Sequence, residues 1–206
     1  MAAIRLEPHG RYEDLDLEGA DLRGADLVGA VLVRCRLRAA TLVEARTRAC
    51  RFEECDLELA RLGGSRHEET AFLNCRFGGA GLFEARFTRC KMVGSGFEGA
   101  QWAGARVEGG DWSLTVLREA LLASAALSRA RLIDADLTRA VLTGADLRGA
   151  DLSRASLTGA ALAGTDLRGA ILHGIDFRGV VLRGARLDAA QAVVVVRSLG
   201  ALCDLE

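Results

Sequence analysis

A five-residue repeat constrains the fold of this chain more than any other feature. There are 36 positions whose numbers end in 2 or 7 between Tyr12 and Leu187, and 34 of them hold a large apolar or aromatic residue. The two exceptions are Thr47 and His67. The residue two positions before each large one is usually small, most often alanine, and this frame does not slip between residues 10 and 190.

The charged residues follow the same register. Between residues 10 and 190 the chain holds 25 acidic and 25 basic residues, and none of them occupies the small or the large apolar position. Because burying an unpaired charge is costly, two positions of each repeat are predicted to face inward and three outward. A helix rotates about 500° over five residues, and a strand alternates with period two, so neither keeps this register. The repeat predicts a coil that turns a corner every five residues.

Composition excludes several other classes of protein. With 27 basic and 28 acidic residues, the chain has no excess of positive charge for binding nucleic acid directly. Half of the residues are apolar, which argues against disorder. There is no apolar run near the roughly 18 residues of a membrane span, and the start lacks the pattern of a secretory signal. The six cysteines then indicate reduced thiols and a cytoplasmic location.

Residues 188–206 are predicted to form a helical cap and dimerisation segment. Asp188 is suited to the N-cap, Gln191 to position N3 and Gly200 to the end of the helix. The β preference of valine leaves a terminal strand as the alternative. A helix that is apolar all round needs cover on two sides, so we expect one side to close the last coil and the other to meet a second copy. The expected dimerisation residues are Ala192, Val193, Val194, Val195, Val196 and Leu199.

The residues with chemical potential fit a structural role better than catalysis. Five cysteines occupy the small inward position without CxxC spacing, so they are predicted to be core residues, while Cys203 is predicted to be a free thiol in the tail. His67 is predicted to be a hydrogen-bonded core histidine. The sequence shows no catalytic triad spacing, phosphate-binding glycine loop or metal-ligand cluster. We therefore expect no enzyme activity, no cofactor and no small-molecule substrate.

Units such as Ala145-Asp146-Leu147-Arg148-Gly149 resemble the pentapeptide-repeat family. The resemblance implies an all-β solenoid, a right-handed quadrilateral β-helix in which four edges close a turn of 20 residues. Residues 10–187 would then form about nine coils, with residues 1–9 as an N-terminal cap. At a strand spacing of about 4.8 Å the coils give a rod about 43 Å long.

Such a square coil has four outer faces, which we name after the large residue of the first coil. The Tyr12 face carries 7 acidic and 6 basic residues, the Leu17 face 8 and 6, and the Leu22 face 3 and 3. The Leu27 face carries 7 and 10, including Arg46, Arg48, Arg66, Arg86, Arg89 and Arg106. The Leu22 face is the most apolar, and contiguous exposed apolar area often marks an interface. Its apolar residues are Val43, Phe83, Leu121, Val141 and Val181.

A closer resemblance concerns the gyrase-protecting pentapeptide-repeat proteins of the MfpA and Qnr type. Residues 65–77, 87–95 and 187–193 resemble their middle coils and terminal dimerisation helix, and the uninterrupted frame is closer to MfpA. The resemblance implies a homodimeric rod that binds DNA gyrase where DNA would lie. It also implies protection against fluoroquinolones or other gyrase poisons, as antibiotic resistance or self-immunity.

Carboxylates in place of phosphates would carry this binding. The candidate partner-binding residues are Glu53, Glu54, Asp56, Glu58, Glu98, Glu119, Asp136 and Asp176. DNA has one charge per roughly 1.7 Å, whereas the charges of the repeat body cancel, so only local clusters can imitate it. The alternative is an interaction scaffold that binds an unrelated protein through the Leu22 face. An ice-binding rod would need regular threonine arrays, which the sequence lacks.

Overall fold

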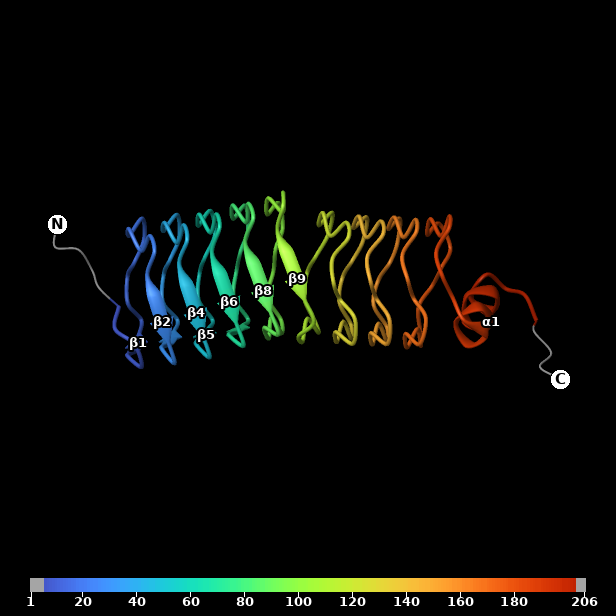
Figure 1. Cartoon of the computed structure of the whole chain (residues 1–206), viewed down its shortest axis with the longest axis horizontal. Coiled ribbons are helices and arrows are strands. Elements are labelled where there is room, and N and C mark those ends of the chain that lie inside the picture. The colour runs from blue at the N-terminus through green and yellow to red at the C-terminus, as the bar shows by residue number, and fades with distance from the viewer. Residues whose placement is uncertain (1–5, 203–206) are drawn as a thin grey trace.

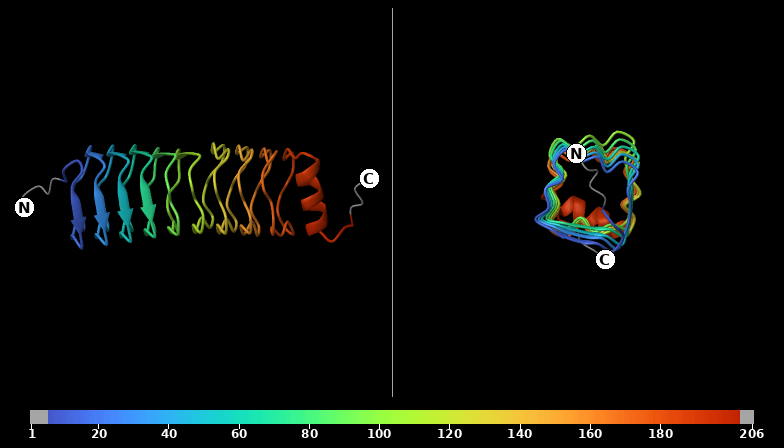
Figure 2. Two further views of the ribbon diagram at one scale, coloured as in Figure 1. Left: turned by 90° about the horizontal axis from the view of Figure 1, so that it is seen from below. Right: turned by 90° about the vertical axis from the view of Figure 1, so that its left-hand side faces the viewer.

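The computed structural model describes residues 6–202 and confirms the quadrilateral β-helix. Its coils stack into a rod (Figure 1), and the view along the rod is square (Figure 2). Residues 1–5, which begin the predicted N-terminal cap, and residues 203–206, which include Cys203, lie outside the described part of the chain.

Short parallel strands run along two sides of the rod. The first sheet has the order β1-β3-β5-β7 and lies on the Tyr12 face, and the second has the order β2-β4-β6-β8-β9 and lies on the Leu27 face. Paired residues are one coil apart, as in Arg11 with Val31 and Asp26 with Arg46. The strands are β1 Arg11–Glu13, β2 Asp26–Val28, β3 Val31–Val33, β4 Arg46–Arg48, β5 Arg51–Glu53, β6 Arg66–Glu68, β7 Ala71–Leu73, β8 Arg86–Thr88 and β9 Arg106–Glu108.

These extended strands cover about five turns rather than the whole stack. Beyond β9, isolated bridges carry the same parallel pairing from coil to coil, as far as the bridge between Asp166 and Arg186. In this part the chain makes a tight turn at each corner of the square coil. Between two corners usually only one residue pairs with the neighbouring coil. The coil predicted from the repeat therefore continues to the helix, but with less regular strand than in its first half.

Two types of corner occur in the coils. A type II turn needs positive φ at its third residue, which Gly19 supplies at 65°, and the Ala20 N–H then donates to the Leu17 carbonyl at 3.0 Å. All five described cysteines instead follow a strand, and each is buried. The Cys50 thiol, for example, donates to the carbonyls of Leu27 and Arg48 at 3.3 and 3.5 Å. A cysteine thus provides a hydrogen-bond donor of its own at a wider corner.

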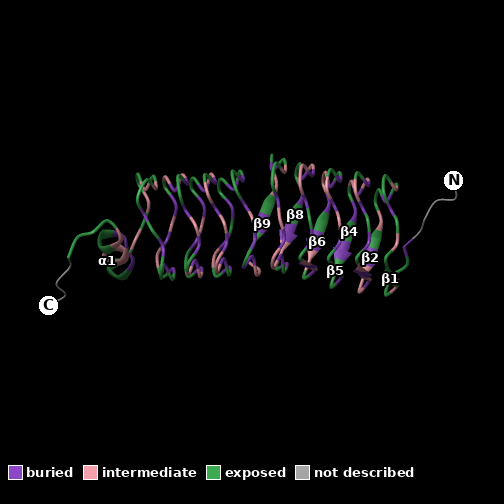
Figure 3. Ribbon diagram, turned by 180° about the vertical axis from the view of Figure 1, so that it is seen from behind, coloured by how far each residue is buried: buried purple, intermediate pink, exposed green. Residues whose placement is uncertain are grey.

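The interior changes character along the rod. From residue 52 to residue 112 it is rich in aromatic rings, and from 117 to 172 every large inward residue is leucine. Phe52 stacks on Phe72, and Phe77 stacks on Phe97, each with ring centroids 4.7 Å apart. Figure 3 shows the alternation of buried and exposed residues along the coils. The segregation of side chains predicted from the five-residue repeat is therefore present on all four sides.

The two exceptions to the repeat lie on adjacent coils and compensate for each other. His67 Nδ1 is 2.8 Å from the Thr47 hydroxyl, and His67 Nε2 is 2.9 Å from the Ser65 hydroxyl. Thr47 also lies 2.9 Å from the Thr70 hydroxyl, and the imidazole stacks on Phe87 at 5.0 Å. Burial lowers the pKa of His67 to about 3. His67 is the satisfied core histidine that the sequence predicted, and Thr47 is its partner.

The coil stack contains one step, after β9. Glu108 bridges Ala126, 18 residues later, whereas the other bridges in the described residues span 20. Within residues 6–202, no backbone hydrogen bond joins 101–105 to 121–125. Gly110 has φ 94°, and a Cβ there would lie 2.3 Å from the Cys90 carbonyl oxygen, so only glycine fits. Figure 1 shows the displacement between β9 and the next turn.

The step lies beside the two tryptophans, where the aromatic interior meets the leucine interior. Their rings are 6.5 Å apart. Trp112 Nε1 donates to the Gly109 carbonyl at 3.0 Å, but the buried Trp102 Nε1 has no partner in the described residues. An unsatisfied buried N–H costs about 1–3 kcal/mol. The local change of register therefore coincides with the two bulkiest side chains of the interior.

The described ends of the rod are covered. At the N-terminal end Leu6 is buried, and the His9 N–H donates to the Val28 carbonyl at 2.7 Å. At the other end α1 (Ala189–Ser198) begins with the predicted capping box of Asp188 and Gln191, so the terminal strand is excluded. Neither this ten-residue helix nor any other part of residues 6–202 forms a helix fit to cross a membrane.

The histidine network makes a testable contribution to stability. Because unfolded histidine binds a proton near pH 6.5 and buried His67 only near pH 3, the folded state should lose about 1.4 kcal/mol per pH unit below 6.5. We expect the double variant Thr47→Leu, His67→Phe to lack this component. Urea unfolding at pH 7, 6 and 5 measures the difference, and parallel slopes for the two proteins would contradict the assignment.

The buried thiols should be unreactive in the folded protein. Burial raises the pKa of Cys90 to about 12, and the thiolate is the reactive form. In a Cys203→Ser variant we expect iodoacetamide to label no thiol under native conditions and five after unfolding. Mass spectrometry counts the adducts, and rapid native labelling of any of the five would show that the coils open.

Candidate functional site

The acidic candidates are spread over two adjacent faces and several coils. Glu53 and Glu54 lie on the Tyr12 face, and the other six lie on the Leu17 face. Six of the eight are paired with arginine side chains. The pairs are Glu53–Arg51 at 2.7 Å, Asp56–Arg76 at 2.6 Å, Glu58–Arg38, Glu119–Arg139 at 2.6 Å, Asp136–Arg118 at 2.5 Å and Asp176–Arg178 at 2.6 Å.

The pairing follows from the stacking of the coils. Asp16, Arg36, Asp56 and Arg76 succeed one another in the bridges of the Leu17 face, so charges of opposite sign alternate over the first four coils. Exposed pairs of this kind stabilise a fold by at most about 1 kcal/mol each. In one of these pairs, hydrogen bonds from Arg178 lower the pKa of Asp176 to about 2. The Leu17 face is therefore a mosaic of charges rather than a continuous acidic strip.

Glu54 and Glu98 are the two candidates that form no ion pair with the described residues, and both are exposed. Glu98 shares a groove of about 410 Å³ with Glu58, Asn74 and Arg76. Gly78, Gly94 and Gly96 also line it, and a Cβ at Gly78 would contact the Glu58 side chain at 3.4 Å. The structure thus brings Glu58 and Glu98 together, whereas Glu119, Asp136 and Asp176 lie on coils further along the rod.

The Leu22 face exposes the apolar residues that the sequence placed there. Phe83 is 58%, Leu121 55% and Val181 51% exposed, while Val43 and Val141 are half-buried. Glycine and alanine separate these side chains along the face. The face is thus a row of apolar contacts suitable for an interface, although the side chains are not continuous.

Helix α1 divides the predicted dimerisation residues into two groups. Gln191 Nε2 donates to the Ala170 carbonyl at 3.1 Å, and Val195, 7% exposed, belongs to the core cluster. Val195 therefore belongs to the cap and is not available to a second copy. Ala192, Val193 and Val194 are half-buried. Val196 and Leu199, 39% and 57% exposed, provide the free apolar side of the helix.

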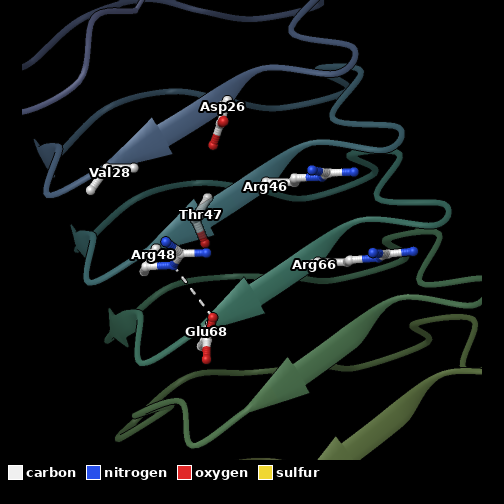
Figure 4. A pocket seen from close by; sticks show the side chains of 7 residues that line it. All are labelled: Asp26, Val28, Arg46, Thr47, Arg48, Arg66 and Glu68. Carbon is white, nitrogen blue, oxygen red and sulfur yellow. Dashed lines mark ion pairs between the residues drawn. The ribbon is translucent and has the colours of Figure 1, made fainter.

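A groove on the Leu27 face was not anticipated from the sequence. It has a volume of about 270 Å³ and is lined by residues of β2, β4 and β6. Arg48 pairs with Glu68 at 3.4 Å, whereas Arg46 and Arg66 extend side by side in another direction (Figure 4). A charge count for the whole face does not show that Arg46 and Arg66 lie side by side. Comparing residues one coil, or 20 positions, apart in the sequence would have shown it.

The family comparison agrees with the coil architecture. A model described as pentapeptide repeats matches residues 16–53, 100–139, 135–174 and 162–192. No curated protein matches the sequence.

Two solved structures resemble the whole rod. The first is trypsin-treated QnrB1, a plasmid-mediated fluoroquinolone resistance protein, with a TM-score of 0.77 and 23% identity over 95% of this chain and 100% of that chain. The second is HetL, involved in the regulation of heterocyst differentiation in the cyanobacterium Nostoc, with a TM-score of 0.62, 26% identity and 90% coverage of each chain. At these identities the similarity establishes the fold.

The two sides of α1 should respond differently to substitution. We expect the wild type to be a dimer and Val196→Asp, Leu199→Asp to be a folded monomer, because both side chains point away from the last coil. Val195→Asp should instead destabilise the cap by several kcal/mol through its buried charge. Light scattering gives the mass and thermal unfolding gives the stability. A dimer that persists in the double variant would place the interface elsewhere.

Proposed function

The chain belongs to the pentapeptide-repeat family, and from its geometry we propose that it binds DNA gyrase, or a related type II topoisomerase, as a dimeric rod. The observation that carries the proposal is the shape: a rod of stacked square coils that matches QnrB1 along the whole length of that protein. In this role it would protect the enzyme from fluoroquinolones or other gyrase poisons, as antibiotic resistance or self-immunity.

The rod would act as a rigid surface. Its outward side chains are fixed to coils about 4.8 Å apart, so a partner that holds DNA in a channel meets charges at set intervals. The apolar outer side of α1 supports end-to-end dimerisation, which would double the length of the rod. The proposal requires no cofactor, catalytic group, membrane or nucleic acid, and it places the protein in the cytoplasm.

Electrostatic contact would be local. Six candidate carboxylates already have arginine partners, so their attraction for a basic channel is weakened by the neighbouring positive charge. Glu54 and Glu98, which form no ion pair within residues 6–202, are the acidic candidates freest to bind a basic side chain of the partner. Closeness to the MfpA type in particular remains a prediction.

The experiment is a gyrase supercoiling and DNA cleavage assay with and without ciprofloxacin. We expect micromolar dimer to reduce drug-stabilised cleavage, and Glu54→Lys, Glu98→Lys to weaken this effect about tenfold through charge reversal. Glu84→Lys is the matched control, since Glu84 is exposed on the Leu22 face and has no ion pair in the described residues.

An absence of effect on both activities by folded wild-type dimer would contradict the gyrase proposal. The second candidate function, an interaction scaffold for an unrelated protein, would then be favoured. Its supporting observation is the exposure of Phe83, Leu121 and Val181 on the Leu22 face. Such apolar side chains would bind a protein surface without any need to resemble DNA.

A further inference from the structure

Four arginines form a row on the Leu27 face. Arg46, Arg66, Arg86 and Arg106 are direct neighbours in the ladder of β4, β6, β8 and β9, and all four are exposed. Successive members are about 4.8 Å apart at the backbone. Like charges directly opposite each other destabilise a sheet. The row is therefore an unfavourable arrangement unless an anion lies against it.

Other arginines of the same face have partners within the chain. Arg48 pairs with Glu68 at 3.4 Å, and Arg89 pairs with Glu69 at 2.9 Å. None of the four arginines in the row forms an ion pair or a side-chain hydrogen bond with the described residues. In Figure 4, Arg46 and Arg66 extend parallel to each other and away from the Arg48–Glu68 pair. Their guanidinium groups are thus available to a ligand.

A groove runs beside the first two members of the row. It has a volume of about 450 Å³ and is lined by Arg46 and Arg66 together with Gly24, Gly64, Asp26 and Glu44. The two glycines have positive φ and carry no side chain that would fill the groove. A chain lying there would reach the backbone while its acidic side chains contact the guanidinium groups, and its uncharged side chains would have to face Asp26 and Glu44, which also line the groove.

We propose that this arginine row binds an extended acidic peptide segment of a partner protein. The four arginines span about 14 Å, and three carboxylates at alternate positions of an extended strand span about 13–14 Å. The spacing of about 6.7 Å between carboxylates exceeds the spacing of about 4.8 Å between arginines, so the long arginine side chains have to bend to meet them. Arginine is suited to this task because its planar group binds a carboxylate through two parallel hydrogen bonds. The partner would therefore carry Asp or Glu at positions i, i+2 and i+4.

The charges beside the row favour a peptide over a nucleic acid duplex. Glutamates flank the row along the chain on both sides. Glu44 and Glu84 lie two residues before an arginine of the row, and Glu68 and Glu108 lie two residues after one. A duplex carries phosphates over its whole width and would bring them onto these carboxylates, whereas a single extended segment can follow the arginines alone. The net charge of −1 also gives the chain no general attraction for nucleic acid.

The test uses a fluorescein-labelled heptapeptide with glutamate at the second, fourth and sixth positions and threonine elsewhere. Fluorescence anisotropy should show binding to the wild type that weakens as salt is raised. The double variant Arg66→Gln, Arg86→Gln should bind the peptide at least about tenfold more weakly than the wild type, because two charge-assisted contacts are lost. The matched control is Arg61→Gln, Arg183→Gln, two exposed arginines of the Leu22 face without ion pairs in the described residues.

The row variant also has a readout that separates binding from folding. Because it removes repulsion between neighbouring arginines, its melting temperature without peptide should not fall below that of the wild type. A folded row variant with unchanged affinity would overturn the proposal. So would equal binding of a peptide with lysine in place of glutamate, or a 12-nucleotide DNA duplex that competes better than the unlabelled acidic peptide. Gyrase assays are independent of all these outcomes, since the row lies on a different face from the acidic candidates.

Discussion

The rest of the structure depends on a backbone hydrogen-bond ladder that repeats once per coil. Parallel pairing one coil apart places each inward side chain on top of its counterpart in the next coil, so each inward residue has to suit the residues one coil before and after it. The same rule governs the outer surface. Opposite charges in register give the Asp–Arg alternation of the Leu17 face, and like charges in register give the arginine row of the Leu27 face.

This rule explains how much of the structure was accessible from the sequence. The coil, the buried cysteines and the capping box of α1 were predictable because each depends on residues near in sequence or on the repeat itself. The partnership of Thr47 with His67 was not predicted, although the two are one coil apart, because each was judged as a separate departure from the pattern. Buried polar residues in a solenoid need to be compared with the residue one coil away.

The candidate surfaces were less predictable than the fold, and for a physical reason. Counting charges by face gives a net value, but recognition depends on which charges remain unpaired. In the count of charges on each face, Asp56 and Glu98 each contribute one negative charge. In the structure the charge of Asp56 is paired with Arg76, whereas Glu98 has no such partner in the described residues. Arginine side chains reach across coils in directions that the repeat does not specify. The same limit applies to Val195, whose burial depends on the angle at which α1 meets the last coil.

The step beside Trp102 has a mechanical consequence. In a solenoid each coil is held mainly by its two neighbours, so total stability is roughly a sum of neighbour terms. In the described part of the chain, the ladder lacks backbone hydrogen bonds between residues 101–105 and 121–125, and again between residues 155–159 and 176–178, so two of those neighbour terms are smaller. Torsion or bending imposed by a bound partner would therefore concentrate where those bonds are missing, rather than spread evenly along the rod.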